Sequence, residues 1–162
     1  MRENRPMTTY FTLTELLKKA IEKEVEAQTL YTELSRRVEE TAVRVALQAL
    51  VRQEEGHQKL LEHYRDGKLK GGVSRKGQRL NYRIVEILDH GEISADMALK
   101  DVFLLAAERE KTAHEFYLAL AEIHPAGEAK TLMTDLAAQE LGHKHRVEYL
   151  YTEVAFPQLD GG

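Results

Sequence analysis

The sequence predicts an all-α protein, an antiparallel four-helix bundle made of two similar helical hairpins joined by a long crossover. Several long stretches place apolar residues three, four or seven positions apart, which is the spacing of one face of a helix. Only three of the 162 residues are proline, and strand signals are weak throughout. The two halves of the chain also resemble each other, which indicates that one hairpin occurs twice.

The composition predicts a single domain and is compatible with a reducing compartment. A chain of 162 residues with 43% hydrophobic and 31% charged residues can bury a core without help from disulfides or structural metal ions. It contains no cysteine, which excludes disulfides, zinc ribbons and rubredoxin-type iron sites. No apolar run reaches the roughly 20 residues of a membrane span, and the first residues lack the core of a signal peptide. With a net charge of −4 and no large basic block, we expect a cytoplasmic protein that binds neither membranes nor nucleic acid.

The first hairpin is expected over about residues 12–66. Thr12 and Glu15 have the spacing of a capping box at the start of a long amphipathic helix. Thr41 is the expected cap of the second helix, and Gly67 is its expected stop. The turn between the two helices is very short, so we expect them to pack antiparallel.

A longer connection, about residues 67–93, follows the first hairpin. It begins with the glycine-rich, basic stretch KLKGGVSRKGQ and contains a candidate short helix, NYRIVEIL, at residues 81–88. A connection of this length can carry the chain from one end of a bundle to the other, so we interpret it as a crossover.

The second hairpin is expected over about residues 94–154. Ser94 is the expected cap of its first helix, and Pro125 and Gly127 break the chain between its two helices. The remaining residues, 155–162, are expected to form a loose tail.

An internal repeat relates the two hairpins. A shift of 86 residues aligns Ala20–Tyr64 with Ala106–Leu150 without a gap, and 12 of the 45 aligned positions are identical. The identities gather in two pairs of motifs, EVEAQTLY with EKTAHEFY and QEEGH with QELGH. Two copies of one hairpin predict a four-helix bundle with a pseudo-two-fold axis.

Six polar residues of these motifs interrupt the apolar helix faces, so in a bundle they point inward. A buried carboxylate is strongly unfavourable unless it is paired, protonated or bound to a metal. The inward faces offer no lysine or arginine at this level, so we take these residues as candidate metal ligands. They are Glu24, Glu54, His57, Glu110, Glu140 and His143.

The numbers of charges and the spacing both predict a dinuclear metal site. Two divalent cations would balance four carboxylates. Residues three apart share a helix face, so Glu54 and His57 can reach one ion together, and the second Glu-x-x-His motif can do the same. Carboxylate-rich coordination suits iron or manganese better than a closed structural zinc site.

The other histidines lack this pattern. Only two of the seven histidines follow a glutamate at the third position, and those two superpose in the repeat. We therefore expect the other histidines to be ordinary surface or core residues. We expect Glu22 and Glu108 to be solvated, because these two glutamates lie about 200° around the helix from the candidate ligands. These other histidines are His63, His90, His114, His124 and His145.

Two further matched pairs lie beside the candidate ligands. Tyr31 and Tyr117 are either plain core aromatics or hydrogen-bond partners of the ligand carboxylates, because a buried tyrosine hydroxyl needs a partner. Gly56 and Gly142 each precede a candidate histidine ligand. We interpret these glycines as positions where two helix backbones approach each other closely.

The four motifs resemble those of the rubrerythrin and ferritin-like superfamily, and the resemblance extends from about Thr12 to Val154. In that superfamily two helices each supply one glutamate, and two others supply Glu-x-x-His, to a di-iron or di-manganese centre. The resemblance implies a ferritin-like bundle with two iron ions, although manganese or a mixed pair stays open. By this resemblance, Glu24 and His57 would bind one ion, and Glu110 and His143 would bind the other. Glu54 and Glu140 would bridge the two ions.

The resemblance also implies a reaction. Rubrerythrins reduce hydrogen peroxide and ferritins oxidise Fe(II), so dioxygen or peroxide is the implied substrate. The sequence departs from full rubrerythrins in two respects. It lacks the four-cysteine rubredoxin domain, which implies a separate electron-donor protein, and it has Ala113 where rubrerythrins carry an extra glutamate.

Several functions are compatible with these residues. We expect a peroxide-reducing or ferroxidase-type oxidoreductase, active in oxidative stress or iron handling and assembled as a homo-oligomer, with a dimer as the simplest case. The main alternative is an iron-binding, storage or delivery protein with little turnover. A di-iron enzyme that oxidises an organic substrate would need an apolar pocket beside the site, and a purely structural metal site would show no reaction with oxidants.

Overall fold

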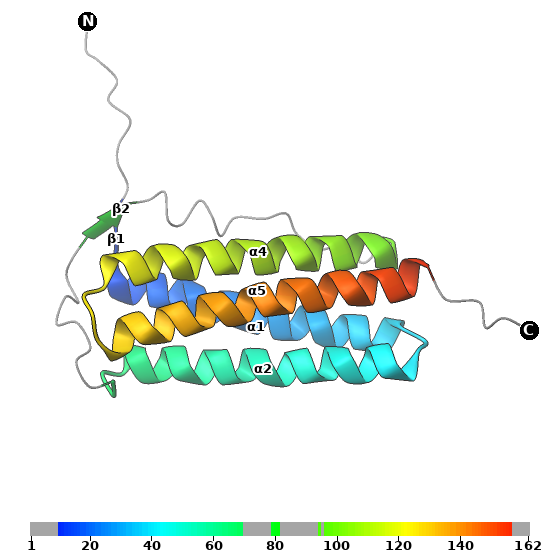
Figure 1. Ribbon diagram of the computed structural model, residues 1–162, viewed down its shortest axis with the longest axis horizontal. Helices are drawn as coiled ribbons and strands as arrows, with labels where there is room; N and C mark the ends of the chain where they lie inside the picture. Colours follow the sequence, from blue (N-terminus) through cyan, green and yellow to red (C-terminus); the bar gives the residue numbers. More distant parts are fainter. Residues whose placement is uncertain (1–9, 70–78, 82–93, 95, 157–162) are drawn as a thin grey trace, which may run out of the picture.

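The predicted four-helix bundle is confirmed by the computed structural model, which describes residues 10–69, 79–81, 94 and 96–156. The long helices, of which the described residues contain four, lie side by side and form the body of the molecule (Figure 1). One short pair of strands, β1 and β2, lies at one end. The elements in chain order are β1 (Tyr10–Thr12), α1 (Leu13–Arg37), α2 (Thr41–Arg65), β2 (Arg79–Asn81), α4 (Leu99–Ile123) and α5 (Glu128–Ala155).

The helices form two antiparallel hairpins, α1 with α2 and α4 with α5. Residues 38–40 connect the first pair and residues 124–127 connect the second. The end of α2 and the start of α4 lie at opposite ends of the bundle (Figure 1). The chain between the hairpins therefore has to travel the length of the bundle, as the predicted crossover requires. As a result, α1 runs antiparallel to α4 and α2 runs antiparallel to α5.

Local sequence signals explain the ends of the first hairpin. The predicted capping box is confirmed: the Glu15 backbone N–H donates to Thr12 Oγ1 at 3.2 Å, and the Thr12 N–H donates to Glu15 Oε2 at 2.7 Å. These two bonds satisfy donors that the first turn of a helix leaves free. Just after α2, Gly67 has a φ of 75°, a conformation that glycine adopts without the steric cost of a Cβ.

Two other predicted caps are wrong. Thr41 is already the first residue of α2, and Glu40, which occupies the cap position, makes no side-chain hydrogen bond there. Ser94 lies in a turn in which its carbonyl accepts a bond from the Met97 N–H at 3.1 Å. This turn delays the start of α4, whose cap position is Ala98.

The strand pair was not predicted. β1 and β2 pair antiparallel, with Tyr10 opposite Asn81 and Thr12 opposite Arg79. Three residues a strand are too few to show an alternating pattern in the sequence. Asn81 belongs to β2, and the rest of the candidate helix at 81–88 lies outside the described residues.

The ends of the chain differ slightly from expectation. The predicted tail starts at residue 155, but Ala155 is the last residue of α5. Residues 157–162 of that tail lie outside the described part of the chain. No helix among the described residues is long and apolar enough to cross a membrane.

Two apolar clusters fill the bundle, one toward each end. The first contains Leu16, Leu61, Phe116 and Met133, and the second contains Leu34, Leu47, Phe103 and Val147, with each helix contributing to both. On every helix, the buried glutamates and histidines lie between the segment that joins one cluster and the segment that joins the other. The core is therefore divided by a polar layer that is closed off on both sides.

Replacement of Thr12 by alanine should destabilise the protein by about 1 kcal/mol, because it removes the acceptor of the capping box. Urea denaturation of the wild type and of Thr12→Ala measures the difference. Thr41→Ala is the matched control, since Thr41 is exposed and does not occupy the cap position of its helix. An equal loss of stability in both variants would contradict the assigned cap.

Candidate metal centre

The six predicted ligands meet in the polar layer between the two apolar clusters. Helix α1 supplies Glu24 and α4 supplies Glu110, whereas α2 and α5 each supply a Glu-x-x-His pair. All six residues are buried, with exposed fractions between 1% and 6%. They are Glu24, Glu54, His57, Glu110, Glu140 and His143.

Each imidazole faces three carboxylates through its Nδ1 atom. His57 Nδ1 lies 2.8 Å from Glu140, 3.1 Å from Glu54 and 3.6 Å from Glu24. Nδ1 carries one hydrogen at most, so it cannot satisfy three acceptors.

His143 has matching surroundings in the other half of the repeat. Its Nδ1 lies 2.9 Å from Glu54, 3.4 Å from Glu140 and 3.8 Å from Glu110. The two rings are stacked, with centroids 5.3 Å apart and planes inclined by 14°. The site therefore has two similar halves, each with one imidazole.

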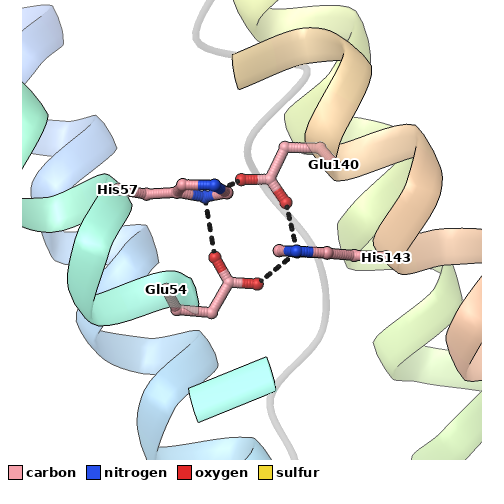
Figure 2. Close-up of side chains that lie close together, drawn as sticks. All are labelled: Glu54, His57, Glu140 and His143. Carbon is pink, nitrogen blue, oxygen red and sulfur yellow. Dashed lines mark hydrogen bonds and ion pairs between the residues drawn. The ribbon is translucent and has the colours of Figure 1, made fainter. Parts of the chain in front are cut away.

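Glu54 and Glu140 span both halves. Figure 2 shows their carboxylates between the two imidazole rings, with one oxygen of each directed at each ring. One possible metal-ligating atom from each of Glu54, His57, Glu140 and His143 lies within 4.8 Å of the other three, so this group could hold a metal ion. Among the described ion pairs, Glu24 reaches only His57 and Glu110 reaches only His143. This division matches two metal positions with two shared carboxylates.

An unpartnered oxygen supports the fit of a cation. Glu54 Oε2 is buried and has no hydrogen-bond partner among the described residues, although it lies 3.1 Å from His57 Nδ1. His57 Nδ1 makes its hydrogen bond with Glu140 instead, at the shorter distance of 2.8 Å. A buried acceptor without a partner is unfavourable, and a bound cation would give it one.

The pKa values of the cluster are shifted, which shows how strongly its charges interact. Burial raises the pKa of Glu24 and of Glu110 well above the usual carboxyl range, and the neighbouring Glu140 adds to this effect. Burial opposes charge on the imidazoles too, but hydrogen bonds to the carboxylates outweigh it. The pKa of His143 rises to about 9, and the pKa of His57 also rises well above its usual value.

The two shared glutamates behave differently. Burial acts to raise the pKa of Glu54 and of Glu140, but the nearby imidazoles, together with Glu24 beside Glu54 and Glu110 beside Glu140, outweigh it and lower both values. Without metal, at neutral pH, the cluster therefore balances two imidazolium ions against two carboxylates, and the other two glutamates keep their protons. Metal ions would have to displace these protons.

Two tyrosines connect the hairpins at the ligands. Tyr31 of α1 donates a hydrogen bond to Glu110 of α4, and Tyr117 of α4 donates one to Glu24 of α1. Burial raises the pKa of both hydroxyls well above 10, so they stay neutral donors. Each tyrosine holds one oxygen of a glutamate whose other oxygen faces an imidazole.

Gln139 is a contact that the sequence analysis missed. Its side-chain oxygen lies 2.8 Å from His57 Nε2. An amide oxygen only accepts, so Nε2 carries a hydrogen. In a neutral ring this leaves the Nδ1 lone pair directed at the carboxylates, as a metal ligand requires. The available signal was the matched pair Gln53 and Gln139, which precedes both ligand motifs in the repeat.

The interpretation of the two glycines is wrong. A Cβ atom built at Gly56 or at Gly142 would have no neighbour within 4 Å, so no helix backbone approaches closely there. Gly142 instead lines an open groove of about 520 Å³ between α2 and α5, together with Gln53, Gln139 and His143. The glycines border a surface rather than a helix contact.

The remaining histidines lie elsewhere. His63 and His145 are exposed, and His114 contacts the Ala137 carbonyl at 2.6 Å. His124 is buried and lies 2.6 Å from the Tyr64 hydroxyl. His90 lies outside the described residues.

A small cavity borders the centre between α1 and α4. Its volume is about 40 Å³, and its walls include the four glutamates and both tyrosines of the cluster. A cavity needs about 10–15 Å³ on this measure to hold one water molecule, so this one accepts very small molecules.

Two of three comparisons with known proteins find a match for this chain. The sequence model of the Rubrerythrin family matches residues 15–151. A solved structure of a hypothetical protein from Pyrococcus furiosus is similar, with a TM-score of 0.68 and 29% sequence identity over 90% of this chain and 91% of that one. A search of the curated proteins gives no match.

The stability of the metal-free protein should fall as the pH rises from 6.5 to 9. The pKa of His143 is about 9 in the folded state against 6.5 ordinarily, so its contribution is fully present below pH 6.5 and is lost as the pH passes 9. His57 acts in the same direction. The expected loss from His143 alone is about 3 kcal/mol, measured by urea denaturation at a series of pH values.

Protein loaded with a divalent metal is the control for this series. Its ligands are already deprotonated, so its stability should not fall over the same range. A metal-free protein whose stability is constant from pH 6.5 to 9 would contradict the assigned protonation of the histidines.

Proposed function

Because the chain belongs to the rubrerythrin family, we propose that it is a non-haem di-iron oxidoreductase that reacts with hydrogen peroxide or dioxygen. The buried cluster of glutamates and histidines, which could bind metal, supports the di-iron part of this proposal. Two bound iron ions would supply the two electrons that cleavage of one peroxide O–O bond requires. Manganese remains an alternative for one or both positions.

The small cavity between α1 and α4 is the observation that carries the choice of substrate. It touches all four carboxylates of the cluster, so a molecule within it would lie beside the metals. Its volume of about 40 Å³ suits peroxide or dioxygen better than a larger substrate. This argues against the oxidation of an organic molecule.

The side chains around the cavity have defined tasks in such a reaction. Glu54 and Glu140 would bridge the metals, and each terminal glutamate would bind through the oxygen that faces its histidine. Tyr31 and Tyr117 would hold the other oxygens of these terminal glutamates. Because their hydroxyls stay neutral, they can donate hydrogen bonds within the cavity wall without adding charge.

Repeated turnover needs a supply of electrons. The 162 residues contain no cysteine, so they hold no cysteine-ligated iron that could serve as a relay. We therefore expect the electrons to come from a donor outside these residues.

A second candidate function is the holding or delivery of iron with little turnover. The open groove between α2 and α5 favours it, because it brings solvent to the His143 side of the cluster and would let metal ions exchange. The two functions differ in how many ions the protein takes up.

Protein loaded anaerobically with Fe(II) and mixed rapidly with peroxide should oxidise two iron ions per chain faster than free Fe(II) reacts. Glu54→Gln should slow this reaction at least about tenfold, because it removes a bridging carboxylate. Glu55→Gln is the matched control, since Glu55 is the adjacent residue and is exposed. Oxidation no faster than that of free Fe(II) would overturn the proposed enzyme activity.

Titration with Fe(II) separates the enzyme from the storage protein. The cluster has two halves, so binding should saturate at two ions per chain, as measured by metal analysis after desalting. Uptake well beyond two ions, together with little turnover when a reductant is supplied, would favour storage.

A further inference from the structure

We infer that small molecules reach the metal centre through the cavity between α1 and α4, and that Arg109, held by Glu26, gates its mouth. The inference rests on the proposed function only in naming the centre as the destination. It assigns a role to charged residues that ligate no metal.

The cavity has a polar floor and a charged outer wall. Its floor is formed by the four glutamates, and its wall includes Ala27 and Ala113, which are half-buried and leave room beside the carboxylates. Lys23 and Arg109 line the same cavity. Each of these two pairs is related by the 86-residue repeat, so the wall is built alike from both hairpins.

One carboxylate oxygen ties the charged residues together across the helices. Glu26 Oε2 on α1 lies 3.2 Å from Arg109 Nη1 on α4 and 3.1 Å from Lys23 Nζ. The Arg109 side chain is only 19% exposed, whereas Glu26 is 45% exposed. The bridge therefore lies where the cavity meets solvent and joins the two helices that form it.

The bridge is suited to open and close. Ion pairs that water can reach are weak, because water competes for both partners, and surface side chains change rotamer within nanoseconds. With the bridge formed, the Arg109 side chain lies along the cavity wall. When the bridge opens, that side chain can swing into solvent and widen the mouth.

Arg109 also has a hydrogen-bond donor that no described residue uses. Its Nε–H is buried and has no hydrogen-bond partner among the described residues. A buried donor without an acceptor is unfavourable, and a polar molecule in the cavity would provide one. The residue can therefore both restrict the mouth and receive a small polar guest.

The groove on the opposite face is a poorer route to the carboxylates. The residues that line it include His143, Gln53, Gln139 and Arg146, but none of the four glutamates. Of the six residues of the cluster, a molecule in that groove would contact only His143. Arg146 makes this groove a natural control for effects of charge alone.

Cysteine labelling of the metal-free protein tests the gate directly. The chain has no cysteine, so Ala113→Cys places a single thiol in the cavity wall, and its rate of reaction with methyl methanethiosulfonate reports access. Glu26→Gln and Arg109→Ala should each increase this rate about two- to fivefold, the factor that corresponds to loss of one exposed ion pair. Arg146→Ala removes the same charge from the opposite face and should leave the rate unchanged.

A second thiol guards against general loosening of the fold. Ala49→Cys lies in the groove between α2 and α5, and its labelling rate should not respond to Glu26→Gln or Arg109→Ala. A labelling rate of the Ala113→Cys thiol that neither substitution changes, or that Arg146→Ala raises equally, would overturn the gate, as would a thiol that never reacts. Since no metal or turnover is involved, failure of the peroxide reaction would affect only the proposed function.

Discussion

The mutual repulsion of four buried carboxylates is the constraint on which the rest of this structure depends. Glu24, Glu54, Glu110 and Glu140 share one layer of the core, and among the described residues only His57 and His143 form ion pairs with them. The layer is stable only if positive charge enters it, either as protons or as metal ions. The shifted pKa values show how protons supply this charge when no metal is bound: two imidazoles and two carboxyl groups are protonated.

This same layer joins the two hairpins. Tyr31 bonds to Glu110, Tyr117 to Glu24, His57 to Glu140 and His143 to Glu54, and each bond crosses from one hairpin to the other. Within each hairpin the two helices pack along their whole lengths. The repeat therefore explains how each hairpin forms, but it does not explain how the two hairpins bind each other. Apolar clusters on both sides exclude water and strengthen these crossed bonds.

The two open sides of the centre differ although the halves of the repeat are alike. The side between α1 and α4 is a narrow cavity that touches carboxylates, with a charged bridge at its mouth. The side between α2 and α5 is a broad groove that reaches only an imidazole. The pseudo-two-fold axis exchanges α1 with α4 and α2 with α5, so it relates each side to itself and leaves the two sides free to differ.

The sequence by itself determined the four helices, the hairpin pairing and the six glutamates and histidines that meet in the buried polar layer. Those features follow from local periodicity and from a repeat that marked Glu24 and Glu110, with the two Glu-x-x-His motifs, as inward and equivalent. Only the tertiary structure decided that Tyr31 and Tyr117 bond across the hairpins, that Gln139 orients His57, and that Gly56 faces open space. It also decided the strand pair and the cavity with its Arg109 bridge. These depend on the distances and register between helices, which are set by packing over the whole core and leave no pattern within a single helix.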